Sequence, residues 1–189
     1  MAWLPGAWAA TPLQAVASAA GEPQICVIAP RVESDADGRV DGTVPNARPT
    51  LVVADPLAEL QIERGGARPW RAHIHVSKRA GTPIPWPLAP LKPGEQALLR
   101  LRPRGAAAGN FASVRLRAAA DQELRSSERL VGRLGRDPKA WEQAVDGALA
   151  RQQVPLAWAL LFDPRAPVSQ ALQGLRVDLL SQGCGPGGG

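Results

Sequence analysis

The chain of 189 residues has no tyrosine, two phenylalanines and one methionine, so six tryptophans make up most of its aromatic residues. It has only two cysteines, Cys26 and Cys184, and two histidines, His73 and His75. Because neither cysteine lies in a Cys-x-x-Cys motif or at metal-ligand spacing from a histidine, a zinc ribbon and a zinc finger are excluded. The apolar run at the start of the chain is short and interrupted by proline, so the sequence predicts no transmembrane span.

The overall composition is that of a folded domain with many turns. An apolar fraction of 45% suffices for a core, and 19 glycines with 19 prolines favour turns over long elements. The formal net charge is +5, and arginine far outnumbers lysine. This excess indicates either a GC-rich genome or a surface for phosphate and other polyanions. Because the basic residues are interleaved with acidic ones, nucleic acid is not expected as a partner, and no motif implies a cofactor.

Residues 1–20 carry no charged side chain and end in an alanine-rich stretch. Small residues at Ala17 and Ala19 fit the cleavage site of a secretory signal peptide. The basic start of such a peptide is missing, and Pro5 and Pro12 interrupt the apolar run. We therefore expect residues 1–20 to be the remnant of a signal peptide or a disordered leader, and we expect the protein to be periplasmic or otherwise exported.

Export changes what the two cysteines are expected to do. In an oxidising compartment Cys26 and Cys184 are candidates for a disulfide that joins the two ends of the chain. Closing so long a loop would stabilise the fold by about 4–5 kcal/mol in the chain-entropy model. The alternative is a buried Cys26 on a strand and a free, exposed Cys184.

Alternating apolar and polar residues predict β structure in the first part of the chain, with one wet face. The segment 81–93 is too rich in proline for a central strand and predicts an extended edge. The polar segment 31–48, with its Asp-Gly and Pro-Asn pairs, predicts a loop. The expected strands are residues 25–28, 50–53, 58–63, 70–76, 96–102 and 111–118, the last two forming an antiparallel hairpin.

The stretch Leu91-Lys92-Pro93-Gly94, followed by an alternating strand, resembles the corner between two strands of fibronectin type III and immunoglobulin-like domains. Trp70, placed before the proline-rich edge, also fits bacterial versions of such modules. The resemblance implies an antiparallel β-sandwich over residues 21–119. In that family a tyrosine locks the corner, whereas this chain has Ala97 or Leu98 there. A core tryptophan is also usual where this chain has Val52-Val53.

Helical periodicity replaces alternation after residue 120. We expect helices over 121–134, ended by Gly135, over 138–149 with Asp137 as N-cap and Pro138 at the first position, over 156–162, and from Val168 or Ser169 to about 180. The second and third helices resemble one tetratricopeptide-type hairpin without a second copy. The predicted fold class is therefore α+β, with an immunoglobulin/fibronectin III-like antiparallel sandwich followed by three to four short helices. Residues 120–182 form the helical appendage, and 183–189 a flexible glycine-rich tail. This layout is similar to that of an uncharacterised extracytoplasmic family of cyanobacteria.

The pair His73-x-His75 places two imidazoles on one face of a strand, as some metal sites do. Glu59 and Glu63, on a neighbouring strand, are the available carboxylate ligands. The alternative is two solvated histidines on the wet face. Neither Ser77 nor Ser113 lies in a nucleophile-elbow context, so no catalytic residue is predicted.

Two further features are candidates for binding. The outward positions of three strands form an arginine stripe, for which the alternative is pairing with Glu59, Glu63 and Glu95 across strands. Trp86 either belongs to an exposed recognition loop or plugs the edge of the sandwich. The arginine stripe consists of Arg71, Arg100, Arg102, Arg115 and Arg117.

These features yield three functional hypotheses. The first is a non-enzymatic, extracytoplasmic binding or accessory module with a protein or cell-surface partner. The second is a metal-dependent enzyme that uses His73 and His75. The third is a protein that binds an anionic polymer through the arginine stripe.

Overall fold

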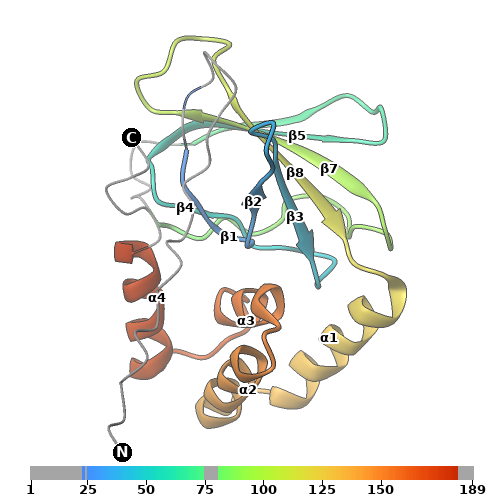
Figure 1. The fold of residues 1–189 in the computed structure, drawn as a ribbon, viewed down its shortest axis with the longest axis vertical. Helices are drawn as coiled ribbons and strands as arrows, with labels where there is room; N and C mark the ends of the chain where they lie inside the picture. The colour runs from blue at the N-terminus through green and yellow to red at the C-terminus, as the bar shows by residue number, and fades with distance from the viewer. Residues whose placement is uncertain (1–22, 24, 75–80, 183–189) are drawn as a thin grey trace, which may run out of the picture.

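The structure is a computed structural model that describes residues 23, 25–74 and 81–182. Within that part, eight strands come before four helices, as predicted for an α+β chain (Figure 1). None of these helices is both long enough and apolar enough to cross a bilayer. The strands are β1 (Val27–Ala29), β2 (Glu33–Ser34), β3 (Val40–Val44), β4 (Val52–Val53), β5 (Leu57–Arg64), β6 (Trp70–His73), β7 (Gln96–Pro103) and β8 (Ala112–Ala118). The helices are α1 (Asp121–Leu134), α2 (Pro138–Ala150), α3 (Val154–Leu161) and α4 (Gln170–Gln182).

Six strands form one sheet in the order β2-β3-β8-β7-β5-β6, and β1 pairs with β4 in a second sheet. All pairs in the larger sheet are antiparallel except β3 with β8, which is parallel. The predicted hairpin of the two long strands is confirmed as β7 and β8. Alternation buries one face of the large sheet, because every second side chain points inward. The buried side chains of its central strands include Leu60, Ile62, Leu99, Leu101, Val114 and Leu116.

The prediction of a loop over residues 31–48 is wrong, because this segment contains β2 and β3. The residues of β3 alternate as strands do, with Val40 and Val44 buried and the polar positions between them more exposed. A tight turn joins the two strands, in which Asp35 Oδ1 accepts from the backbone N–H groups of Asp37 and Arg39, each at 2.9 Å. The prediction gave more weight to the Asp-Gly and Pro-Asn pairs than to the short alternation of Val40 to Val44. It was wrong because β-turns and loops contain the same residue types.

The small sheet of β1 and β4 contributes to two hydrophobic cores. Ile25, Leu51 and Val53 pack with the buried face of the large sheet, in what we call the sheet core. Ile28 and Val52 pack with the helices, in what we call the helix core. Successive residues of a strand point to opposite sides, so this short pair of strands lies between the two cores. In Figure 1 the helices gather at one end of the strands, with α3 near β1 and β3 and α1 beyond the ends of β3 and β8.

The helices begin and end close to the predicted residues. Asp137 caps α2, with its Oδ1 accepting from the N–H of Lys139 at 3.0 Å, and Pro138 occupies the first turn. Gly135, with a φ of 55°, follows α1, and this positive φ favours glycine at the position that ends the helix. The third helix begins at Val154, earlier than predicted, because a proline in the first turn is tolerated and does not break the helix.

Polar contacts hold the helices to one another inside the helix core. Trp141 is fully buried, and its indole Nε1 donates to the carbonyl of Gly135 at 3.1 Å. Arg176 of α4 donates from Nε to the carbonyl of Leu161 at 2.8 Å, at the end of α3. Burial lowers the pKa of the Arg176 guanidinium. The end of α3 is thereby capped by a side chain of the next helix.

The Pro-Gly corner is a tight turn in which the N–H of Glu95 donates to the carbonyl of Lys92 at 2.9 Å. Gly94 has a φ of 71°, which favours glycine at that position of a turn. The side chain of Glu95 holds this corner. Its Oε2 accepts from the N–H of Lys92 at 2.7 Å and from Nη2 of Arg64 at 2.7 Å.

Arg64, at the end of β5, completes this lock. Its Nε donates to Glu95 Oε1 at 2.9 Å, and its Nη1 donates to the carbonyl of Ala89 at 2.7 Å. The hydrogen bond from the Lys92 backbone, followed by that from Arg64, lowers the pKa of the Glu95 carboxyl. A charge-assisted, forked contact of this kind is directional and strong, so the Arg64–Glu95 pair fixes the corner.

We predict that replacing Glu95 with glutamine lowers the free energy of unfolding by about 1–3 kcal/mol at pH 7, because hydrogen bonds to an ionised group are lost. The folded-state pKa of Glu95 lies below its unfolded value, so its contribution is present above the unfolded value and is lost as pH falls through the folded one. Urea unfolding from pH 7 down to pH 3 should show a smaller loss of stability in Glu95→Gln than in the wild type. Parallel pH curves for the two proteins would contradict this assignment.

Candidate functional site

The outward face of the six-stranded sheet gathers all five arginines of the stripe. Arg71 lies on β6, Arg100 and Arg102 on β7, and Arg115 and Arg117 on β8. The strand registers place them in neighbouring rows of one face, because pairs such as Glu59 with Arg102, and Leu98 with Arg115, lie directly opposite each other. The sequence therefore predicted correctly that these arginines share a face.

Three of these arginines are paired with carboxylates of the neighbouring strands. Arg102 contacts Glu59 at 3.2 Å and Arg100 contacts Glu63 at 2.9 Å, as the pairing alternative predicted. Arg115 contacts Asp41 of β3 at 3.3 Å, a pair that the sequence reading missed. Glu95, the third expected partner, instead binds Arg64. The face is therefore a mosaic of both charges rather than a continuous cationic strip.

Glu59 shows how these pairs set the electrostatics of the face. Its Oε1 accepts from Nε2 of Gln61 at 2.8 Å, and its Oε2 accepts from the guanidinium of Arg102. The hydrogen bond from Gln61, followed by that from Arg102, lowers the pKa of the Glu59 carboxyl. The carboxylate is thus held ionised at neutral pH, which suits an electrostatic role and not that of a proton donor.

The histidines of the predicted metal site are only partly covered by the structure. His73 is exposed on β6, directly opposite Glu59, whereas His75 lies outside the described residues. Glu59 and Glu63 are engaged with Arg102 and Arg100. No group of three or more potential metal-ligating side chains occurs among residues 23, 25–74 and 81–182.

Trp86 is half-buried and packs against the sheet core. Its indole Nε1 donates to the carbonyl of Ala89 at 3.0 Å. The nearby Ile84 forms a β-bridge with Leu51, so the proline-rich segment runs along the small sheet. These contacts favour the plug at the edge of the β layers over an exposed recognition loop.

Cys26 lies directly before β1, where its N–H donates to Asp55 Oδ2 at 2.8 Å. Cys184 lies outside the described residues, as do the leader, residues 1–20, and the tail, residues 183–189. The disulfide between the two cysteines therefore stays a prediction.

A cleft of about 500 Å³ opens at the β2–β3 end of the outward face. Arg31, Arg115 and Arg117 line it together with Glu33 and Asp41. Within the part of the chain that the structure describes, Arg31 and Arg117 form no ion pair. Sequence reasoning missed Arg31 because it lay in the segment expected to be a loop. The alternation of Val40 to Val44 was the sequence signal from which strand β3 could have been predicted.

Two backbones approach closely at Gly42 of β3, which is one of the residues that line the cleft. A Cβ at this position would lie 2.7 Å from the carbonyl oxygen of Arg31 and 2.9 Å from Val32 Cγ1. Only a residue without a side chain lets the chain before β2 lie so close to β3. Gly42 thereby places the backbone of Arg31 against the sheet.

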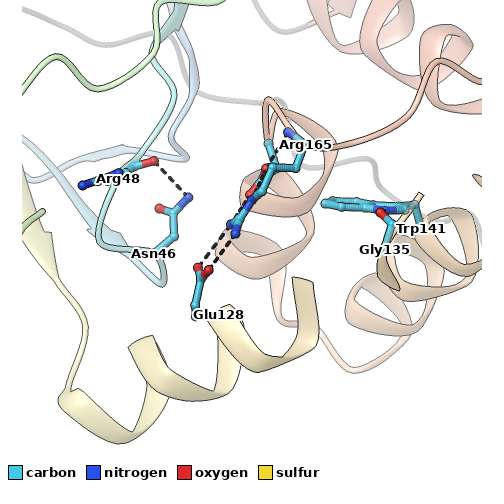
Figure 2. A network of polar contacts seen from close by, with 7 residues as sticks. Asn46, Arg48, Glu128, Gly135, Trp141 and Arg165 are labelled. Carbon is cyan, nitrogen blue, oxygen red and sulfur yellow. Dashed lines mark hydrogen bonds and ion pairs between the residues drawn. The ribbon is translucent and has the colours of Figure 1, made fainter. Parts of the chain in front are cut away.

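A second cleft, of about 450 Å³, lies between the loop 46–48, α1 and the turn after α3. Figure 2 shows Arg165 in this region, reaching Glu128 of α1 with Nη1 at 2.6 Å. Arg165 also binds Asp163 through Nε at 3.0 Å and Nη2 at 2.9 Å. The hydrogen bond from Arg165 lowers the pKa of the Glu128 carboxyl, and the Asp163 contact, followed by that with Glu128, raises the pKa of Arg165. With its donors engaged, Arg165 serves to join α1 to the α3–α4 connection.

No family model, curated protein or solved structure matches this chain.

We predict that Gly42→Ala lowers the free energy of unfolding by about 1–3 kcal/mol, because the new Cβ displaces the Arg31 carbonyl or bends β3. Gly132→Ala is the matched control, since nothing lies within 4 Å of a Cβ at this position in α1. Alanine there should stabilise the helix by about 0.5–1 kcal/mol. Guanidinium unfolding measures both changes. A Gly42→Ala protein at least as stable as the wild type would show that the close approach is not a constraint.

Proposed function

We propose that the protein is a non-enzymatic binding module that acts outside the cytoplasm, and that a protein or cell-surface partner docks on the outward face of the six-stranded sheet. The observation that carries the proposal is the charge mosaic on this face, together with the arginine-lined cleft at its β2–β3 end. Complementary patterns of both charges give specificity and orientation in protein–protein contacts. The location outside the cytoplasm rests on the sequence of residues 1–20.

A role in binding an anionic polymer is the second candidate. It has support from Arg71 and Arg117, for which the described part of the chain holds no ion pair. The ion pairs of Arg100, Arg102 and Arg115 weigh against it, because a continuous polyanion would meet the carboxylates of those pairs as well. A metal-dependent enzyme at His73 and His75 stays a hypothesis without a described ligand set.

We further propose that the β part is a divergent relative of fibronectin type III and immunoglobulin-like domains. The buried Leu91 and the Pro93-Gly94 turn support this relationship. The two β layers that enclose the sheet core support it as well. The parallel pairing of β3 with β8 departs from a purely antiparallel sandwich. Such a module offers a rigid scaffold whose surface evolves for binding.

A photo-cross-linking residue placed at Ser113 tests the docking face. Ser113 is half-buried on β8, opposite Arg100 on the outward face. We predict a discrete covalent adduct with one partner in cells that make the protein, and its loss when Arg100 and Arg117 are both reversed to glutamate. Gln173, exposed on α4, is the control site. An absence of adduct at Ser113, or the same adduct from Gln173, would contradict the proposed docking face.

A further inference from the structure

The cleft at the β2–β3 end has the size and the donors of a ligand site. Its volume of about 500 Å³ falls within the range of about 300–1,000 Å³ that is usual for small-ligand pockets. Arg117 lies opposite Thr43 on one side and opposite Gln96 on the other in the strand registers. Both of these neighbours also line the cleft. One guanidinium is therefore flanked by a hydroxyl and an amide, which are hydrogen-bonding groups suited to a peptide.

The charges that line the cleft leave one positive charge in excess. Arg31, Arg115 and Arg117 carry three positive charges, and Glu33 and Asp41 carry two negative charges. Asp41 is engaged with Arg115 at 3.3 Å, with both side chains about half exposed. Asp41 thus neutralises the charge of Arg115, and the excess positive charge of the cleft lies on Arg31 and Arg117. A single carboxylate would balance the cleft, and arginine recognises carboxylates with two parallel hydrogen bonds.

The charge balance of the cleft also disfavours a densely charged polymer as its ligand. A chain with a negative charge on every unit would bring several anions close to Glu33 and Asp41, and like charges at short range repel. An acidic side chain between neutral residues avoids this repulsion. Its flanking backbone also finds Gln96 and Thr43 as hydrogen-bonding partners.

We propose that this cleft binds one glutamate or aspartate side chain in an extended segment of a partner protein, with Arg117 and Arg31 as the carboxylate-binding residues. The inference rests on the proposed function, because it names the chemistry that the partner presents to the outward face. Arg115 is a positioning residue that keeps the Asp41 carboxylate occupied, and Gly42 allows the chain that carries Arg31 to approach the sheet.

The test uses two peptides that differ by one charge: acetyl-Thr-Thr-Glu-Thr-Thr-amide and its twin with glutamine in the central position. Binding to the full chain is followed by NMR shifts of the backbone amides of β3 and β8 at low ionic strength, because salt weakens exposed charge contacts. We expect the glutamate peptide to bind about tenfold more tightly than the glutamine peptide, a difference close to the net contribution of one hydrogen bond to a charged group. Arg117→Gln and Arg31→Gln should each remove most of this difference.

Arg39→Gln is the matched control, since Arg39 lies at the exposed tip of the β2–β3 hairpin in a pair with Asp37 and does not line the cleft. It should leave the preference for glutamate unchanged. Equal binding of the two peptides would overturn the carboxylate site, as would a preference that persists in both Arg117→Gln and Arg31→Gln.

A heparin-derived hexasaccharide and inorganic phosphate form the remaining arms of the test. Tighter binding of either at the same amides, lost in Arg117→Gln, would replace the acidic protein segment by a sulfated or phosphorylated ligand and overturn the proposal. The cross-linking experiment at Ser113 tests the docking face independently of the carboxylate site. An adduct that persists while the peptides bind equally would leave the docking face standing and remove only the carboxylate site.

Discussion

Two neighbouring valines, Val52 and Val53, point to opposite sides of one short strand, and the rest of the fold depends on this alternation. Val53 packs into the sheet core and Val52 into the helix core. Both are almost completely buried. A strand that is buried on both sides must be apolar at every position, which explains why β4 shows no polar alternation. It also explains how β elements and helices of one chain come to share packing surfaces.

The placement of the small sheet determines which surface is left for binding. The inner face of the large sheet is closed by the sheet core, whose second wall includes β1, β4 and the proline-rich segment around Trp86. The helix core lies on the other side of β1 and β4, where Ile28 and Val52 pack with residues of the helices. The opposite face of the large sheet keeps its charged residues in solvent, including the half-exposed Arg100 and Arg115. The candidate site is therefore the face that the two cores do not use.

Local patterns predicted much of this architecture. The periodicity of α1 and α2, the cap at Asp137 and the alternation of β7 and β8 are encoded within a few residues of each element. The outward arginines followed from the same alternation.

What the sequence reading missed depends on distant partners. The strand β3 has only five residues, and one of its two neighbours is the parallel strand β8, which lies far along the chain. Arg64 binds Glu95 at the corner although the two residues are 31 positions apart in the sequence. No local sequence pattern predicts such a contact. The cleft combines Arg31 with Arg117, so its charge balance is defined only once β3 and β8 are paired.

The most direct test of this account is native-state hydrogen exchange of Val52→Ala and the wild type, resolved for the amides of Leu160 in α3 and Leu101 in β7. Both residues are buried, one in each core. If β4 couples the two cores, the most protected amides of α3 and β7 open with the same free energy. The substitution should lower both values by the same amount, about 2 kcal/mol for the two lost methyl groups and the small cavity. Loss of protection in α3 alone, with β7 unchanged, would contradict the coupling and show that the helices unfold independently of the sheet.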